Sequence, residues 1–343
     1  MYKLLPINKY FLCKFKNKFI NRKVIFAGNI NDKIPIYLNT LTSFVNTHKY
    51  DYYLWLKKII GEKIYYGLLN SNFKNYNFNV LIFFWLKNKR ESVFLLKNIL
   101  SILTLNSDIF IIGENNSGIK QINNIIELDI VFNKIICARK SIIFHSFYKK
   151  NIIFNKENYW NFYFYKNYKI YNLPGVFSGN KLDNGSKLLI STLDFKVKGK
   201  ILDLGCGAGV ISTVIGRENI LNNGKNVILS TDIDYKAINS TKKTLHKNNI
   251  QNSYVISSDV FSNINEKFDF IISNPPIHDG KKISLKVIYK ILKSIKKYLK
   301  YNGEFRFVTN NSVSYSKIFT KLMYKFCIIC RNKNFSVYSI KNK

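Results

Sequence analysis

The sequence is poor in acidic residues, cysteine and histidine. Its 343 residues include 20 Asp and Glu, 5 Cys and 4 His. The cysteines are odd in number and scattered along the chain, which argues against a disulfide framework and favours a reducing compartment. Cys327 and Cys330 form a single C-x-x-C with no second pair and no nearby histidine, so the sequence predicts no metal site.

Long apolar runs are also missing. No run reaches the about 18 residues that a membrane-spanning helix requires. The N-terminus has no small-residue cleavage site after a clean apolar stretch, as a secretory signal would have. It lacks any acidic residue before Asp32, as a transit peptide does, but lysine is abundant along the whole chain. We therefore expect a cytoplasmic protein.

Positive charge is plentiful. The chain carries 54 Lys and Arg and a formal net charge of +34, which fits a nucleic acid or another anionic partner. The lysines are spread out, and Lys, Asn and Ile, which share A- and T-rich codons, are abundant everywhere. Mutational bias could supply much of the excess, so the charge permits an RNA partner without establishing one.

The second half alternates apolar strands with helical patterns. The clearest helix is Lys281–Lys300, where apolar residues recur at helical spacing opposite lysines. Strands that alternate with helices form a mostly parallel sheet covered on both faces, so the predicted fold class is α/β. The predicted strands are Lys200–Leu204, Asn226–Thr231, Ser253–Ser257, Phe268–Ser273, Glu304–Thr309, Phe326–Cys330 and Ser336–Ile340.

The first half repeats this order of elements. RKVIFAGN takes the place of GKILDLGCG, NVLIFFWLKNK that of FDFIISNPPIH, and SDIFIIGENNSG that of GEFRFVTNNSV. The comparable spacings predict a duplicated domain whose first copy has lost its site chemistry. The alternative is that Ile- and Phe-rich strands look alike by composition alone.

An aromatic segment, Asn158–Asn172, lies between the halves. It interleaves Tyr, Phe and Trp with lysines (NYWNFYFYKNYKIYN). Such side chains could stack on the bases of an RNA. The other interpretation is an ordinary strand pair, followed by a linker at Leu173–Leu189 into the second half.

The strongest local motif is a glycine-rich loop after the strand Lys200–Leu204. It has the pattern D-x-G-x-G-x-G, with Asp203 ahead of Gly205, Gly207 and Gly209. The glycines permit positive φ and a close approach of the backbone to a ligand. The pattern differs from the G-x-G-x-x-G of dinucleotide-binding loops. We expect a loop that bends under an amino-acid-bearing nucleoside, with no pyrophosphate to hold.

Acidic residues follow the next two strands. Asp232 has the spacing of a carboxylate that accepts hydrogen bonds from both ribose hydroxyls of a nucleoside. Asp234 is a competing candidate, which also fits the N-cap of the following helix. Asp259 follows the third strand, where an adenine amino group is often bound. Because ligands bind beyond the carboxyl ends of parallel strands, Asp203, Asp232 and Asp259, at the ends of three successive strands, predict one nucleoside site.

The tetrad Ser273-Asn274-Pro275-Pro276 follows the fourth strand directly. The prolines fix the backbone and remove two N–H donors. The Asn274 side-chain oxygen and the Pro275 carbonyl can then both accept from one planar –NH2 group. This grip aims the developing lone pair of the amine at a methyl donor, so catalysis rests on positioning and electrostatics.

These motifs carry a resemblance to known methyltransferases. D-L-G-C-G-A-G at Asp203–Gly209 and N-P-P-I-H at Asn274–His278 resemble the N-P-P-[FYW] class of nitrogen methyltransferases. With LPGVFS, D-x-G-S-x-L-L at Asp183–Leu189, ISNPPIHDG and the GEN-S-G of the first half, essentially the whole chain resembles the ribosomal RNA small subunit methyltransferase C family. That family forms N2-methylguanosine in 16S rRNA.

The resemblance implies a duplicated class I (Rossmann-like) seven-stranded methyltransferase fold with a degenerate N-terminal copy. It implies S-adenosyl-L-methionine as cofactor and 16S rRNA, in the small ribosomal subunit or its assembly intermediate, as partner. Nothing in the sequence suggests more than a monomer. We expect a degenerate domain at residues 1–172, for RNA binding and support, and a catalytic domain at 173–343.

The resemblance also assigns residues. The expected cofactor-binding residues are Asp203, Gly205, Cys206, Gly207, Gly209, Asp232, Ile233, Asp259, Val260 and Asn274, and the expected catalytic residues are Asn274, Pro275, Pro276 and Ile277. Ile277 stands where the class has an aromatic ring, which lowers base stacking by about a kcal/mol unless Phe177 supplies the ring. His278 either contacts the edge of the base or caps Asp279.

Two other functions stay open. A glutamine side chain in a protein presents a chemically equivalent amide, so an N-methyltransferase for glutamine would carry the same N-P-P motif. The duplicated basic first half argues against it. A non-catalytic ribosome assembly factor with the same fold is the other alternative, and the intact Asp203, glycines and Asn274 disfavour it.

Overall fold

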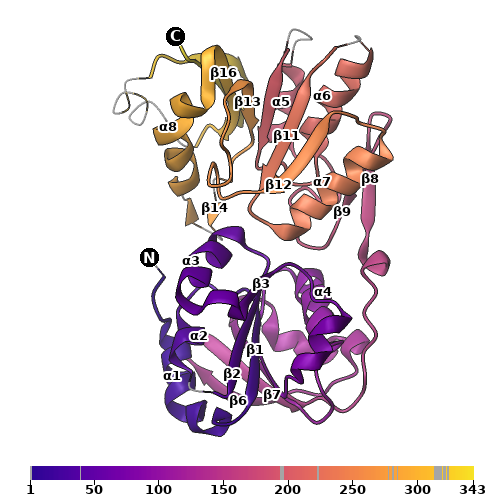
Figure 1. The fold of residues 1–343 in the computed structure, drawn as a ribbon, viewed down its shortest axis with the longest axis vertical. Helices are drawn as coiled ribbons and strands as arrows, with labels where there is room; N and C mark the ends of the chain where they lie inside the picture. The colour runs from indigo at the N-terminus through magenta and orange to yellow at the C-terminus, as the bar shows by residue number, and fades with distance from the viewer. Residues whose placement is uncertain are drawn as a thin grey trace. The chain divides into compact units, whose positions relative to one another are not determined.

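A computed structural model describes residues 2–38, 40–193, 197–221, 224–276, 285–312, 319, 322 and 324–343, and the backbone of 278–279 and 282–283. The chain divides into two compact units, Met1–Tyr159 and Trp160–Lys343. Figure 1 shows both units, and each is described here by itself. In the part of the chain that the structure describes, no helix is both long enough and apolar enough to cross a membrane.

The first unit is built on a seven-stranded sheet in the order β3-β2-β1-β4-β5-β7-β6. All neighbours are parallel except β7, which runs antiparallel to β5 and β6. Its strands are β1 (Lys23–Gly28), β2 (Thr42–Thr47), β3 (Ile64–Tyr66), β4 (Val80–Phe84), β5 (Asp108–Glu114), β6 (Asn133–Ala138) and β7 (Ser141–Phe147). Its α-helices are α1 (Pro6–Phe15), α2 (Ile34–Tyr37), α3 (Tyr50–Ile60) and α4 (Lys89–Leu100).

The second unit contains a seven-stranded sheet in the order β12-β11-β10-β13-β16-β18-β17, in which β18 is antiparallel to its neighbours. Its strands are β10 (Lys200–Leu204), β11 (Val227–Asp232), β12 (Ser253–Ser257), β13 (Phe268–Ser273), β16 (Leu299–Asn310), β17 (Cys327–Arg331) and β18 (Phe335–Lys341). Its helices are α5 (Asn184–Ser191), α6 (Val210–Leu221), α7 (Tyr235–Lys247) and α8 (Lys286–Tyr298).

The duplication predicted from the sequence is confirmed. Numbered within its own sheet, each unit has the strand order third, second, first, fourth, fifth, seventh, sixth. Both sixth strands also carry a register shift against the seventh, between Lys134 and Ile136 in β6 and between Ile328 and Cys330 in β17. A register shift at the same strand of both sheets is hard to attribute to composition alone, because such irregularities are specific features of a fold.

The first copy has lost the features of the predicted site. Gly28 is the last residue of β1 and Gly205 directly follows β10, and both have positive φ, 87° and 82°. A Cβ added at Gly28 would lie 2.2 Å from the Phe84 carbonyl oxygen, whereas one added at Gly205 would meet nothing within 4 Å. The chain of the first copy continues from β4 with Trp85 in place of an Asn-Pro pair. The first copy is therefore degenerate, as predicted.

The aromatic segment forms an ordinary strand pair. β8 (Asn161–Tyr165) and β9 (Tyr168–Asn172) make an antiparallel hairpin that belongs to the second unit, although we placed these residues in the first domain. The hairpin lies along α7 (Figure 1), where the backbone N–H groups of Lys169 and Tyr171 donate to Asn248 and Thr244. These contacts tie the segment to the second sheet through α7.

Helix α8 is shorter than predicted. It begins at Lys286, because Lys282–Ile283 pairs as β15 with β14 (His278–Asp279) and so leaves the helical path. The helix is strongly amphipathic, as its sequence pattern predicts. Its lysines face solvent. Its buried residues are Ile288, Ile291, Leu292 and Ile295, and they pack with Leu202, Leu204, Phe305 and Phe307 on one face of the sheet.

Candidate active site

The predicted site residues gather where β10, β11, β12 and β13 end. These strands are parallel, so their carboxyl ends meet at one edge of the sheet, where ligands of such folds bind. Leu204 pairs with Thr231, and Asp232 pairs with Ser257, which places the loops after β10, β11 and β12 side by side. The Ser273 hydroxyl donates to the Leu204 carbonyl at 2.6 Å and ties the end of β13 to the same edge.

The glycine loop is held open above this edge. The N–H groups of Gly205 and Cys206 both donate to the Thr231 carbonyl, at 2.8 and 2.9 Å. Gly205 and Gly207 have φ values of 82° and 56°, which glycine tolerates best, and a Cβ at Gly205 would enter open space. Gly209 has a different role, because a Cβ there would lie 3.0–3.2 Å from Thr241 of α7. The first two glycines shape a cradle, and the third lets two elements pack closely.

Asp203 is fully buried below the loop. Its Oδ2 accepts from the backbone N–H and the hydroxyl of Ser212 in α6, at 3.2 and 2.5 Å. Within the described part of the chain, no donor reaches its Oδ1. Burial raises the pKa of Asp203 from 3.8 to about 6, although the Ser212 hydrogen bonds act in the opposite direction. An unsatisfied buried carboxylate oxygen at a ligand-binding edge suits a positively charged donor.

This pKa makes the stability of the protein depend on pH. Between about pH 4 and pH 6 the folded protein keeps a proton that the unfolded chain releases, so stability falls as pH rises through this window. A shift of about two pKa units corresponds to about 3 kcal/mol. We expect Asp203→Asn to unfold with a higher free energy than the parent protein at pH 7.5, and with little difference at pH 4, in urea titrations without ligand. Equal stability of the two proteins at both pH values would contradict the burial of a charged carboxylate.

The two acids at the end of β11 have separate roles. Asp232 supports the glycine loop, since its Oδ2 accepts from the Gly207 N–H at 3.0 Å and its Oδ1 from the Asp234 N–H at 2.9 Å. Asp234 is the N-cap of α7, and its carboxylate also pairs with the buried Lys236 ammonium at 2.7 Å. The cap and ion pair explain Asp234 structurally, so Asp232 is the better candidate for a ribose ligand. Ile233 lies half-buried between them.

The loop after β12 has an unusual backbone. Val260 adopts φ = 57°, a conformation in which a β-branched residue is strained. The Ser258 hydroxyl holds it by donating to the Val260 carbonyl at 2.8 Å. The Asp259 carboxylate pairs with Lys290 of α8 at 2.6 Å. Strain of this kind concentrates at functional sites, and the predicted adenine contact of Asp259 and Val260 stays a prediction.

Asn274 lies at the end of β13 with its amide turned toward α5. Its Nδ2 donates to the Ser186 hydroxyl at 2.9 Å and to both carboxylate oxygens of Asp183 at 3.3 Å. We did not single out Asp183 and Ser186 as site residues from the sequence. They come from D-x-G-S at the start of α5, and together with Asn274, Gly205 and Gly207 they line a small pocket or adjoin it.

The structure describes only some of the predicted residues that follow Asn274. Pro275 is buried and Pro276 exposed, while Ile277 and the side chain of His278 lie outside the described residues. Phe177 is 64% exposed, and its carbonyl oxygen lies 4.0 Å from the position of a Cβ on Gly207. The backbone of Phe177 therefore lies close to the glycine loop, and the stacking of its ring on the base stays a prediction.

Cys206 is buried within the glycine loop. Its Sγ accepts from the Thr241 hydroxyl at 3.2 Å, and burial raises the pKa of its thiol well above the usual range. A neutral thiol at this position is a packing group and a poor nucleophile. Its predicted contact with a cofactor would come from the backbone of the loop.

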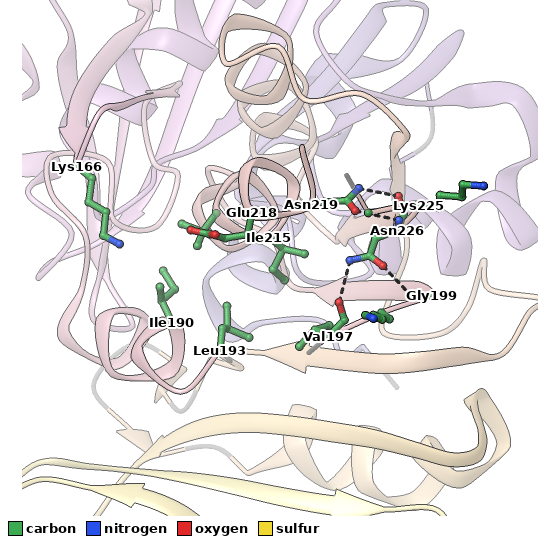
Figure 2. Close-up of a pocket in the computed structure, with 13 residues that line it drawn as sticks. Lys166, Ile190, Leu193, Val197, Gly199, Ile215, Glu218, Asn219, Lys225 and Asn226 are labelled. Carbon is green, nitrogen blue, oxygen red and sulfur yellow. Dashed lines mark hydrogen bonds between the residues drawn. The ribbon is translucent and has the colours of Figure 1, made fainter. Parts of the chain in front are cut away.

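A separate cavity of about 430 Å³ lies at the opposite edge of the sheet (Figure 2). Gly199 and Asn226, which line it, immediately precede β10 and β11, and the Gly199 N–H donates to the Asn226 side chain at 2.8 Å. Lys166, Ile190 and Ile215 also line it. The described residues of its wall include none of the predicted site residues. Since ligands of this fold bind at the carboxyl ends of the strands, we do not assign the reaction to this cavity.

Comparison with known proteins agrees with this architecture. Residues 167–339 match the family described as methyltransferase small domain, and residues 10–163 match its N-terminal companion, methyltransferase small domain N-terminal. The chain is also similar to a solved structure, the 16S rRNA N2 methyltransferase of T. thermophilus in complex with AdoMet and guanosine. The two superimpose with a TM-score of 0.81 at 16% identity, over 96% of this chain and 91% of the solved chain. This similarity confirms the duplicated class I methyltransferase fold.

Curated relatives named ribosomal RNA small subunit methyltransferase C are similar over nearly the whole chain. The protein from Buchnera aphidicola subsp. Schizaphis graminum is 39% identical over 96% of this chain and 97% of its own length. The protein from Photorhabdus laumondii is 34% identical over 99% of both. At this identity and coverage, the chain belongs to the ribosomal RNA small subunit methyltransferase C family.

Proposed function

We propose that this protein transfers a methyl group from S-adenosyl-L-methionine to the exocyclic N2 amine of a guanine in 16S rRNA. The observation that carries the proposal is the Asn274 amide beside the glycine loop, whose –NH2 end is bound by Asp183 and Ser186. Its oxygen is thereby left to accept from a substrate amine. Family membership and the 16S rRNA named for the relatives identify the amine.

The residues of the second unit fit the cofactor. The space over Gly205 is open, so a ligand can lie against the backbone there. Any side chain at this position would fill that space. The Oδ1 of Asp203, which lacks a described donor, suits the ammonium of the methionine moiety. Asp232 would bind the ribose hydroxyls, and the Asp259–Val260 loop the adenine. When bound, S-adenosyl-L-methionine supplies a methyl group activated by a sulfonium.

The chain's own contribution is to hold the amine. The N2 hydrogens would donate to the Asn274 Oδ1 and to the Pro275 carbonyl, while Pro276 stiffens the loop. This arrangement draws the nitrogen lone pair out of conjugation with the ring and points it at the methyl donor. The proton can leave the nitrogen after methyl transfer. Because N2 is inaccessible within a stacked helix, the guanine must leave the stack, and Phe177 or Ile277 would cover its face.

We also propose a role for the first copy, the form of the RNA substrate and the cellular compartment. The degenerate first copy would help to bind RNA and support the catalytic copy, and its lysines would make binding depend on salt. The substrate would be 16S rRNA in the small subunit or in an assembly intermediate. All five cysteines are free, which suits a reducing compartment, and we propose a cytoplasmic monomer.

Transfer of a tritiated methyl group separates this proposal from its rivals. We expect label in the RNA of small ribosomal subunits from cells that lack the protein, and no label in a release factor offered at the same concentration. Label in a glutamine of the release factor would support the protein-directed alternative. A protein that binds no S-adenosyl-L-methionine in calorimetry would support a non-catalytic assembly factor.

A further inference from the structure

The Asn274 amide has two unlike ends, and only one of them can hold a substrate amine. Its Oδ1 accepts hydrogen bonds and its Nδ2 donates them. Rotation of the side chain by half a turn would exchange the two ends with little change in shape. An amide in the wrong orientation would oppose donor to donor and could not grip a –NH2 group. The proposed reaction therefore requires that something fix the orientation of this amide.

The described contacts fix it through acceptors that surround Nδ2. The Ser186 hydroxyl lies 2.9 Å from Nδ2, and the two Asp183 oxygens lie 3.3 Å from it. An ionised carboxylate has no donor to offer. In the rotated orientation Oδ1 would face this carboxylate, and lone pairs would repel where hydrogen bonds now form. The charge on Asp183 thus selects one orientation of Asn274.

Asp183 is itself fixed by the start of α5. Its Oδ1 caps the helix by accepting from the N–H groups of Gly185 and Ser186 at 2.9 and 3.1 Å. Its backbone N–H donates to the Ser178 hydroxyl at 3.1 Å. The positive end of the helix dipole attracts the negative charge of a carboxylate at this position. One residue therefore begins the helix and orients the catalytic side chain.

The same contact makes Oδ1 a better acceptor. A carboxylate that accepts from one end of an amide polarises it and increases the negative charge on the oxygen at the other end. The site is partly withdrawn from water, with Ser186 buried and Asn274 half-buried, so this polarisation is screened less than at the surface.

We propose that Asp183 and Ser186 are positioning residues for methyl transfer: they bind the Nδ2 end of Asn274 and so present its Oδ1 to the substrate amine. The proposal rests on the proposed function, since it concerns the group that would grip the amine. Neither residue needs to contact the RNA or the cofactor.

The variant Asp183→Asn tests the proposal without removing the helix cap. Asparagine caps helices as well as aspartate does, so α5 should keep its first turn. The amide that this substitution introduces can donate as well as accept, however, and no longer selects one orientation of Asn274. We expect kcat to fall about 10- to 100-fold, as for a misplaced catalytic group, with KM for the RNA unchanged within about threefold. Asp129→Asn, which removes an exposed carboxylate paired with Lys150, is the matched control and should leave kcat unchanged.

A double-mutant cycle separates positioning from general damage. If Asp183 acts through Asn274, Asp183→Asn should lower kcat in the parent protein and have no further effect when Asn274 is already Ala. Ser186→Ala should behave in the same way with a smaller loss. Additive losses from Asp183→Asn and Asn274→Ala would overturn the proposal.

The side-chain amide of Asn274 gives a readout independent of activity. Its ¹⁵N–¹H₂ signals, assigned by their loss in Asn274→Ala, should exchange slowly with water in the parent protein and at least about tenfold faster in Asp183→Asn. Equal exchange in both proteins would contradict the contact, whatever the activity. If the parent protein methylates no RNA but its amide is protected as expected, the proposed function fails and the positioning of Asn274 stands.

Discussion

Replacing Asn274 by alanine is expected to lower kcat about 10³-fold in methyl transfer to small-subunit RNA. The variant loses the side-chain oxygen that would accept from the amine, and loss of one such group from a catalytic site typically lowers kcat by about 10²- to 10³-fold. Cofactor affinity should change by about threefold or less, because Asp203, the glycines and Asp232 remain. Single-turnover rates and calorimetry with S-adenosyl-L-methionine measure the two quantities separately.

The matched control is Asn265→Ala, in the exposed loop that precedes β13. It removes an asparagine of the same unit at the other end of that strand, and we expect its kcat to equal that of the parent protein. Turnover of Asn274→Ala at the parent rate would remove the catalytic role that we assign to the N-P-P motif.

Replacing Asp232 by alanine is expected to weaken cofactor binding about 100-fold. The variant loses two hydrogen bonds that shape the loop, from Gly207 and Asp234 at 3.0 and 2.9 Å, and also the proposed contact with the ribose. Hydrogen bonds to a charged group contribute about 1.5–3 kcal/mol each, and about 1.4 kcal/mol corresponds to a factor of ten. The cofactor affinity of Asp232→Asn should lie between those of Asp232→Ala and the parent protein, since an amide keeps one acceptor oxygen.

Glu218→Gln serves as the control for Asp232, because Glu218 lines the cavity at the opposite edge of the sheet. Its cofactor affinity should match that of the parent protein. If Asp232→Ala binds S-adenosyl-L-methionine within about threefold of the parent protein, the ribose assignment is wrong.

The strands of the second unit follow closely from the sequence. β10, β12 and β13 have the predicted bounds, and β11 is shifted by one residue, because each is a short apolar run. The central strands β10 and β13 are buried along nearly their whole length, whereas the edge strand β12 is only partly buried. The start of α8 was not predictable, since Lys282 and Ile283 continue the helical pattern and only their pairing with β14 removes them from the helix. Three strands of the first copy, β1, β4 and β5, were predictable from the segments that correspond to them in the second copy.

The site was predictable where one segment carries it, and not where distant segments meet. The glycine loop and the N-P-P tetrad each lie within a few residues, so their patterns are visible in the chain. The contact of Asn274 with Asp183 joins residues 91 positions apart, and that with Ser186 joins residues 88 apart. Asp183 could have been recognised as a helix cap from D-x-G-S, but its second role depends on the fold that brings α5 to the end of β13.

The most direct measurement is a crystal structure of the protein with guanosine and the unreactive analogue sinefungin. We expect the guanine N2 to lie within about 3 Å of both the Asn274 Oδ1 and the Pro275 carbonyl oxygen. We also expect the Asn274 Nδ2 to stay on Asp183 and Ser186. A guanine bound with another atom at these oxygens, or an Asn274 amide that presents its Nδ2 to the base, would contradict the proposed grip on the amine.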